Sequence, residues 1–379
     1  MVKRIALITD GIWPYVLGGM QKHSYYLCKY LAQNKIEVDV YHFNQSDLDI
    51  SKLEIFTAEE KKYIRSIIID FPKEDKLPGH YIRASYKYSK KIYNVLLPNL
   101  NTYDFIYTKG FSGWHLIRKK YSKKIKCCNI GVKFHGYEMF QTAPAFKARL
   151  QQILFLRKPV KEISKKADVV FSYGSKITEI IKGIGVNTSK IIEIPSGVES
   201  DSILNEIRET SSPLKFIFVG RYERRKGIEE LNEALKQLPQ NLKYEFHFIG
   251  PIPENKKLSQ KNIIYHSEIR DKNNLSLILR NCDVLVCASW SEGFPNVILE
   301  AMAKGLCIAA SNTGATNLLV TDKTGWIIEI PTVRELKSML QQIIQSSASQ
   351  LNDKKRQSLL LVKEKFTWEK LIIELIEKL

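Results

Sequence analysis

The stretch DVLVCASWSEGFPNVILEAMAKGLCIAAS, residues 283–311, carries the pattern that decides the fold. Short runs of small and β-branched apolar residues at 283–289 and 306–311 are typical of buried strands. The apolar segment between them predicts a helix that begins near Asn296 and ends at Gly305, its C-cap. The stretch is therefore expected to form a strand, a helix and a second strand, the repeating unit of a parallel sheet.

The same alternation extends along most of the chain. Expected strands in the first half are RIALIT (4–9), EVDVYHF (37–43), SIIID (66–70), DFIYTK (104–109), NIGVKF (129–134), DVVFSY (168–173) and IIEIP (191–195). Further strands are expected at KFIFVG (215–220), EFHFIG (245–250), NIIYH (262–266) and GWIIEI (325–330). Helical patterns fall between most of them, so the fold class is α/β with parallel sheets covered on both faces.

A polar segment interrupts this rhythm at 200–213 and ends in Ser-Ser-Pro, as linkers do. We therefore predict two domains, at 1–200 and 214–365, with a cleft between them. Apolar residues recur at helical spacing from 352 to 379, which predicts a helical tail.

Two acids stand at the start of the 296–305 helix. Glu292 lies in the loop SEGFPN and Glu300 about one turn into the helix. The loop should lie at the carboxyl edge of a parallel sheet, where ligands bind in open α/β folds. Eight residues apart, the two carboxylates can face one crevice and accept hydrogen bonds from pairs of sugar hydroxyls. The structural alternative is a solvated capping acid and a surface glutamate.

A basic turn, RYERRKG at 221–227, follows another expected strand. Arg221 stands at the end of the strand, and Lys226 comes just before Gly227 and the next helix. Two cations with this spacing can bind a diphosphate, the arginine through its planar fork and the lysine as a point charge. We interpret Arg224 and Arg225 as solvated. The alternative is a basic turn without a ligand.

Two weaker signals lie in the first half. Gly18 and Gly19 open the first long helix, where glycine lets backbone N–H groups approach a phosphate. His135 ends an expected strand in FHGYE and could donate a hydrogen bond to a substrate hydroxyl. A plain Gly-Gly turn and a structural histidine are the simpler explanations.

The 379-residue chain has 58 Lys plus Arg against 40 Asp plus Glu, a net charge of +18, which favours an anionic partner unless it only reflects the source proteome. The six cysteines lack metal-ligand spacing and are interpreted as free thiols in a reducing compartment. We expect neither a signal peptide nor a membrane span, because the apolar runs are too short.

Taken together, the four clusters resemble a retaining glycosyltransferase of family 4 with the GT-B fold, which has two Rossmann-like domains. The motifs run in order through nearly the whole chain: Gly-Gly, His-Gly, G-R-x(4)-K-G and E-G-F-P-N-x(3)-E-A-M-A-x-G. The last is the most specific. The resemblance also implies a C-terminal helix, at about 366–379, that crosses back to the first domain.

The resemblance assigns roles around a nucleoside diphosphate sugar, with a UDP-sugar favoured over a GDP-sugar. Arg221 and Lys226 would bind the diphosphate, together with the backbone at Gly18 and Gly19. Glu300 would hold the ribose hydroxyls. No cofactor and no metal are expected, because no D-x-D sequence stands in a matching place. Asp47 and Asp49 form a D-L-D sequence, but in a polar loop far from the four clusters.

The transferred sugar would be oriented by Glu292 and contacted near its reacting carbon by His135. The backbone of Gly293, Phe294, Pro295 and Asn296 would assist. One departure concerns the stretch TGATNLL, where Ala315 and Asn317 stand in the places of a glycine and a glutamate found in many relatives. This departure leaves the local anion contacts and the sugar preference open.

The acceptor is expected to be a glycan or lipid-linked molecule bound by the first domain, in polysaccharide or lipopolysaccharide synthesis. Basic segments with interleaved apolar residues at 83–96 and 146–166 suggest docking on an anionic membrane, from the cytoplasmic side of the plasma membrane. Helices with one core-facing side and one solvated basic side explain the same pattern.

Three other functions fit parts of the sequence. An epimerase of the same fold would alter the nucleotide sugar without an acceptor. A nucleic-acid-binding protein would account for the +18 charge, but we see no aromatic platform or recognition helix and expect no nucleic-acid partner. A binding module without activity is disfavoured by the intact Arg221, Lys226, Glu292 and Glu300.

Overall fold

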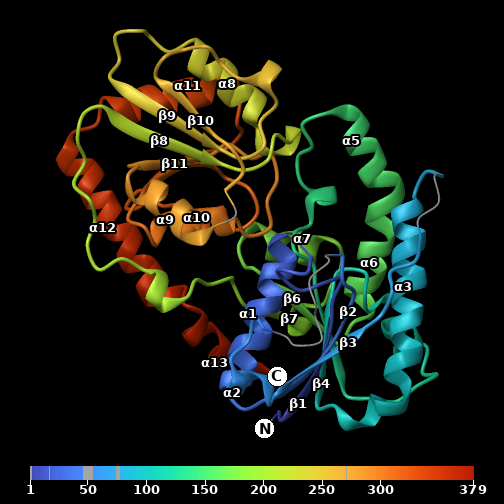
Figure 1. Cartoon of the computed structure of the whole chain (residues 1–379). Coiled ribbons are helices and arrows are strands. Elements are labelled where there is room, and N and C mark those ends of the chain that lie inside the picture. The colour runs from blue at the N-terminus through green and yellow to red at the C-terminus, as the bar shows by residue number, and fades with distance from the viewer. Residues whose placement is uncertain (1, 17, 46–53, 74–76, 270) are drawn as a thin grey trace. The chain divides into compact units, whose positions relative to one another are not determined.

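The computed structural model describes residues 2–16, 18–45, 54–73, 77–269 and 271–379. The chain divides by its internal contacts into two compact units (Figure 1). The first unit comprises Met1–His135, Leu150–Pro195 and Trp368–Leu379, and the second comprises Gly136–Arg149 and Ser196–Thr367. Asp47 and Asp49 lie outside the described residues.

The first unit contains a seven-stranded parallel sheet with the strand order β3-β2-β1-β4-β5-β6-β7. Its strands are β1 (Arg4–Ile8), β2 (Glu37–His42), β3 (Ile64–Ile68), β4 (Phe105–Lys109), β5 (Asn129–Lys133), β6 (Val169–Ser172) and β7 (Ile191–Glu193). Each coincides with a strand expected from the sequence; the expected 66–70 strand starts two residues earlier, at Ile64. The β-branched runs therefore predicted this sheet correctly.

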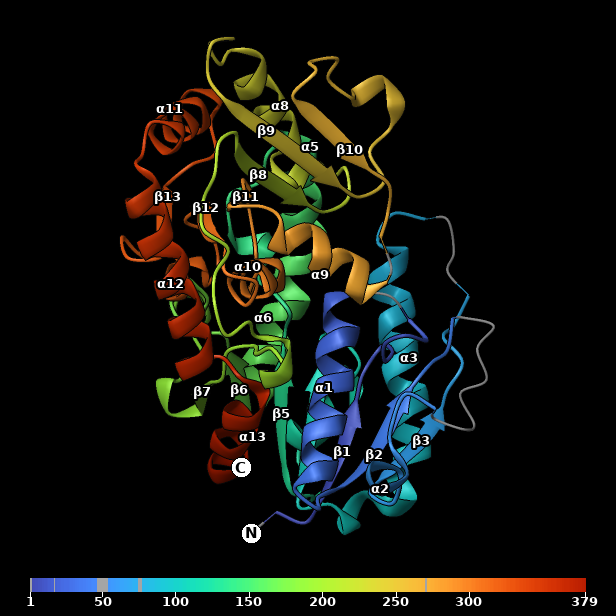
Figure 2. The same cartoon turned by 60° about the vertical axis from the view of Figure 1, so that its left-hand side comes forward.

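Helices cover both faces of this sheet (Figures 1 and 2). They are α1 (Gly19–Gln33), α2 (Ala58–Lys61), α3 (His80–Leu96), α4 (Trp114–Tyr121), α6 (Arg157–Lys166), α7 (Lys176–Gly183) and α13 (Trp368–Lys378). A continuous helical segment leads into α6 through α5 (Phe146–Gln151) and a π-helical stretch, Gln152–Leu156. The α13 helix packs beside α1, and Trp368, Ile372 and Leu375 join the core with Leu27 and Leu31. The predicted return of the C-terminal helix is thus confirmed.

The second unit contains a six-stranded parallel sheet with the order β10-β9-β8-β11-β12-β13. Its strands are β8 (Leu214–Val219), β9 (Tyr244–Ile249), β10 (Ile263–His266), β11 (Val284–Cys287), β12 (Cys307–Ser311) and β13 (Gly325–Ile328). Its helices are α8 (Ile228–Lys236), α9 (Lys272–Arg280), α10 (Asn296–Met302), α11 (Val333–Ile344) and α12 (Ala348–Lys365). The quoted stretch forms β11, α10 and β12, as predicted.

Two boundaries differ from expectation. The α10 helix ends at Met302, three residues before Gly305, which has a φ of +75° and follows the helix rather than capping it directly. The tail forms two helices, α12 and α13. The helix is interrupted at Phe366 and Thr367, and Thr367 forms a parallel β-bridge with Val198. Helical periodicity alone could not show this break, since apolar residues continue across it.

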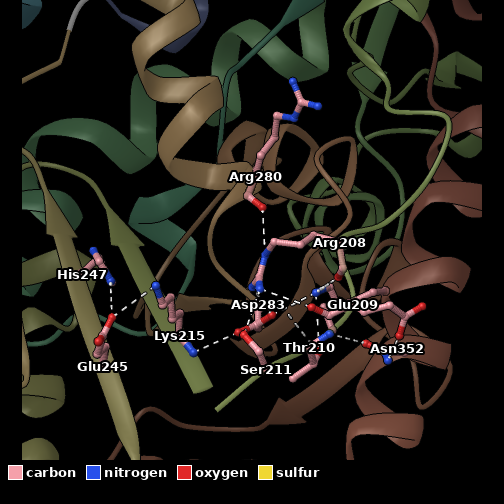
Figure 3. A network of polar contacts seen from close by, with 12 residues as sticks. Arg208, Glu209, Thr210, Ser211, Lys215, Glu245, His247, Arg280, Asp283 and Asn352 are labelled. Atoms are coloured by element: carbon pink, nitrogen blue, oxygen red, sulfur yellow. Dashed lines mark hydrogen bonds and ion pairs between the residues drawn. The ribbon is translucent and has the colours of Figure 1, made fainter. Parts of the chain in front are cut away.

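The polar segment at 200–213 is held firmly within the second unit (Figure 3). Arg208 donates a hydrogen bond to the buried carboxylate of Asp283, whose other oxygen accepts the Lys215 backbone N–H at 3.0 Å. The Lys355 ammonium on α12 donates to the same Asp283 carboxylate at 2.9 Å. The segment is therefore polar because it completes a buried ion-pair network, not because it is a free linker.

Candidate functional site

The residues with the strongest sequence signal lie at the carboxyl ends of β8 and β11. The strand β8 ends at Val219 and leads to a 3-10 turn, Arg224–Lys226, before α8. The strand β11 ends at Cys287 and leads through Glu292 to α10. Because parallel strands place their carboxyl ends at one edge of the sheet, the two loops meet there.

The meeting point is a buried ion-pair cluster. The Lys226 Nζ atom donates to the Glu292 carboxylate at 2.6 Å, and the Ser289 hydroxyl donates to the same oxygen at 2.7 Å. The Arg225 guanidinium lies 3.5 Å from the other Glu292 oxygen and donates to the Ser291 carbonyl at 3.1 Å. The structure thus joins two predicted site residues, Lys226 and Glu292, in one contact.

Both partners keep their charge. Burial alone would raise the pKa of Glu292, but the positive charges of Lys226 and Arg225 outweigh burial and lower it. Burial alone would lower the pKa of Lys226, but the Glu292 charge outweighs burial and raises it. A carboxylate and an ammonium are therefore both present near neutral pH in this cluster.

Two glycines allow the loops to approach so closely. Gly227 has a φ of +65°, and a Cβ atom there would lie 1.8 Å from the Ala288 carbonyl oxygen. Gly314 has a φ of +57°, and its Cβ atom would lie 2.2 Å from the Glu292 carbonyl oxygen. Ala315 then donates its N–H to the Gly293 carbonyl at 2.9 Å. The TGATNLL segment therefore supports the backbone of the Glu292 loop.

Arg221 and Arg225 differ in exposure and in partners. The Arg221 side chain is 75% exposed and pairs with Glu223 at 2.8 Å, and Glu223 also pairs with Arg225 of the cluster at 3.3 Å. The Arg225 side chain, interpreted as solvated, is only 33% exposed and faces Glu292. That interpretation of Arg225 was wrong, because the sequence does not show which side chain of the basic run Arg224–Lys226 points toward the β11 loop. Arg224 pairs instead with Glu229 and Glu230.

The remaining predicted residues of this loop flank the cluster. Phe294 and Pro295 are buried, and Asn296 begins α10 as expected. Glu300 lies in the middle of α10, partly exposed, one turn before Lys304. Gln141 was not predicted, yet its Nε2 atom donates to the Glu292 carbonyl at 2.7 Å and its Oε1 atom accepts the Glu292 N–H at 3.4 Å.

In the first unit the structure brings Gly19 and His135 together. A Cβ atom on Gly19 would lie 2.9 Å from the His135 Nε2 atom, while Nδ1 of His135 lies 3.0 Å from the Tyr173 hydroxyl. Gly18 directly precedes the first turn of α1. The Lys109 ammonium contacts that turn: it donates hydrogen bonds to the Met20 carbonyl at 3.0 Å and to His23 Nδ1 at 2.9 Å.

This part of the first unit is electrostatically unusual. Burial lowers the pKa of Lys109 to about 7, although the charge of Asp10 acts in the opposite direction. Burial also raises the pKa of Asp10 to about 6. Neither Asp10 nor Lys109 stands in a recognisable motif, so this interaction could not be predicted from the sequence.

Over the described part of the chain, no cluster of three or more His, Cys, Asp or Glu side chains has the arrangement of a metal site. Cys28, Cys282, Cys287 and Cys307 are buried free thiols, as expected, and Cys127 and Cys128 are partly exposed free thiols.

The chain was also compared with known proteins. The family model for glycosyltransferase family 4 matches residues 17–202, and the model for glycosyl transferases group 1 matches residues 200–359. An uncharacterised glycosyltransferase of Methanocaldococcus jannaschii is 24% identical over 97% of this chain and 96% of its own length.

Two solved structures share the fold over nearly their full lengths. The lipopolysaccharide outer core galactosyltransferase WaaB superposes with a TM-score of 0.72 at 17% identity, covering 99% of this chain and 100% of its own. Anabaena HepE, solved in complex with UDP, superposes with a TM-score of 0.69 at 15% identity, covering 99% of each chain. With the two family models spanning residues 17–359 between them, the chain belongs to the retaining glycosyltransferases of family 4.

Proposed function

We propose that this chain transfers a hexose-type sugar from a nucleoside diphosphate sugar, preferably a UDP-sugar, to a glycan or lipid-linked acceptor. The product would belong to cell-surface polysaccharide or lipopolysaccharide. The observation that carries the proposal is the buried cluster of Lys226, Arg225 and Glu292 at the carboxyl edge of the six-stranded sheet. Support for the donor comes from the UDP complex of HepE, and support for the setting comes from WaaB, a lipopolysaccharide outer core galactosyltransferase.

The cluster suits the departure of a diphosphate. As the glycosidic bond breaks, negative charge develops on the leaving phosphate, and cations already in place stabilise it without reorganisation. Lys226 and Arg221 are proposed to bind this group, and the Gly19 backbone to donate to it. Because Lys226 pairs with Glu292, a bound diphosphate would share its ammonium with that carboxylate.

The other proposed roles concern the sugar, the ribose and the acceptor. Glu292 and His135 are proposed to orient and contact the transferred sugar, and Glu300 to accept hydrogen bonds from the ribose hydroxyls. The first domain is proposed to bind the acceptor. The leaving phosphate would take the acceptor's proton, so no enzyme nucleophile is required.

A thermal-shift titration with UDP, UDP-glucose, GDP and GDP-mannose tests the donor site, because a ligand that binds only the folded state raises the melting temperature. We expect a rise of several degrees for the matching donor in the wild type and its loss in Lys226→Ala and Glu300→Ala. An unchanged shift in both variants would contradict the assignment. Conversion of the donor to a different sugar without acceptor would favour the epimerase alternative.

We further propose that residues 146–156 of the helical segment 146–166 dock on an anionic membrane surface. The rest of the segment, α6, buries one face, including Val160 and Ile163. Neither α5 nor the following π-helical stretch contains a buried residue, and Phe146 and Leu154 are 82% and 61% exposed. Lysines and arginines are interleaved with these apolar residues, as in helices that lie at a lipid interface. By contrast, α3 buries one face, including Tyr88 and Ile92, so the 83–96 segment fits the core-facing explanation.

Sedimentation with phosphatidylglycerol vesicles tests this docking. We expect binding at low salt that weakens as the salt concentration rises, and a marked loss of binding in Leu154→Glu. The control is Leu360→Glu, on an exposed position of α12, which should bind like the wild type. Absence of binding at low salt would rule the idea out. Within the part of the chain that the structure describes, no helix is both long and apolar enough to cross a bilayer.

A further inference from the structure

The segment Gly136–Arg149 belongs to the second unit, although the residues on both sides of it belong to the first. It begins with a 3-10 turn, Glu138–Phe140, closed by a hydrogen bond from the Gln141 N–H to the Glu138 carbonyl at 3.0 Å. Tyr137 and Met139, on either side of Glu138, are buried. The backbone of Glu138 is therefore fixed by packing on both sides.

This turn is attached directly to the Glu292 loop. The Gln141 side chain pairs with both the N–H and the carbonyl of Glu292, as described above. Glu138 begins the 3-10 turn that ends next to Gln141, three residues before that contact. Burial raises the pKa of Glu138, with Glu292 acting in the same direction and Arg225 and Lys226 in the opposite one.

The two carboxylates differ in how far they are already engaged. Glu292 accepts from Lys226 and Ser289 and faces Arg225. The Glu138 side chain is partly exposed, and among the described residues it accepts no hydrogen bond from another side chain. A carboxylate can accept about four hydrogen bonds. Most of these positions on Glu292 are already occupied, whereas Glu138 can still accept hydrogen bonds from a ligand.

We propose that Glu138 is a further binding residue of the donor site, whose carboxylate accepts hydrogen bonds from hydroxyl groups of the transferred sugar. This inference rests on the proposed function and refines it. Glu138 would then share recognition of the sugar with Glu292, whose carboxylate also holds Lys226 beside the diphosphate site. Two neighbouring carboxylates disfavour an acidic sugar, so the arrangement selects a neutral hexose.

Calorimetric titrations with a nucleoside diphosphate and with its sugar derivative separate the two roles. The probes are UDP with UDP-glucose and GDP with GDP-mannose. In Glu138→Ala we expect the affinity for the parent diphosphate to stay within about twofold of wild type, because no contact to phosphate is lost. The affinity for the nucleotide sugar should fall by about 10- to 100-fold, the range for hydrogen bonds to a charged group.

Two further variants complete the experiment. Glu138→Gln keeps one acceptor oxygen and should recover part of the lost affinity, which a purely structural role of the charge would not predict. Glu254→Ala removes an acid whose side chain is 87% exposed and should behave like the wild type. Equal losses for diphosphate and nucleotide sugar, or no loss for either, would overturn the role of Glu138. Failure of the wild type to bind any of the four probes would instead overturn the proposed function, and this inference with it.

Discussion

Replacing Lys226 by alanine is expected to lower kcat for sugar transfer by about 100- to 1000-fold, the usual effect of removing one preorganised group that stabilises charge in a transition state. The Lys226 side chain is only 20% exposed and lies 2.6 Å from Glu292. Its loss removes a cation from a site that excludes most solvent, where water cannot replace it. Initial rates at saturating donor, with transferred sugar as the readout, measure the effect.

A matched control exists on the next helix. Lys236→Ala removes the same charge from a side chain that is 56% exposed and paired with Glu233 at 3.4 Å, and its kcat should stay within about twofold of wild type because exposed pairs contribute little. Lys226→Arg keeps the charge but changes its geometry, so we expect partial recovery. If Lys226→Ala transferred sugar as fast as Lys236→Ala, the diphosphate would have to be stabilised elsewhere.

The second large effect concerns stability. Asp283→Asn should lower the free energy of unfolding by about 3 kcal/mol, because it leaves a buried cation without its counter-charge. Asp283 is fully buried, the Lys355 side chain is 1% exposed, and the two lie 2.9 Å apart. Arg208, from the 200–213 segment, loses the same partner. Urea unfolding followed by circular dichroism gives the free energy.

The control for this prediction is Asp353→Asn. Asp353 forms an exposed ion pair with Arg356 at 3.1 Å, so its loss should change the free energy of unfolding by less than about 1 kcal/mol. Adding Lys355→Met to Asp283→Asn should restore part of the loss, since the second change removes the unpaired buried charge. A double variant whose loss equals the sum of the two single losses would argue against direct coupling of these groups.

The strands were predictable because each is a short buried run of β-branched and aromatic residues, and strands of parallel sheets are apolar on both faces. The same rule could not separate α12 from α13, because Leu359, Val362 and Phe366 continue the apolar pattern up to Trp368. What divides the two helices is a pairing of Thr367 with Val198, which no local pattern contains.

The site was predictable in part. The loop and helix around Glu292 carry the motif E-G-F-P-N-x(3)-E, and Lys226 belongs to the motif G-R-x(4)-K-G. These motifs allowed Glu292 and Lys226 to be predicted as site residues. Their direct contact could not be predicted, because it joins residues 66 positions apart. Arg225, Gln141 and Glu138 were missed for the same reason. Each owes its place to how a turn or segment packs, and a single basic or polar residue in a loop gives no sign of the direction in which it points.

The position of α13 bears on how the polypeptide acquires its structure during synthesis. Residues up to Thr367 suffice to complete the second unit, whereas the first unit still lacks Trp368, Ile372 and Leu375 at that stage. The apolar face of α1, with Leu27 and Leu31, stays partly uncovered until α13 has left the ribosome. The half of the protein that is translated first is therefore the half that can finish folding last.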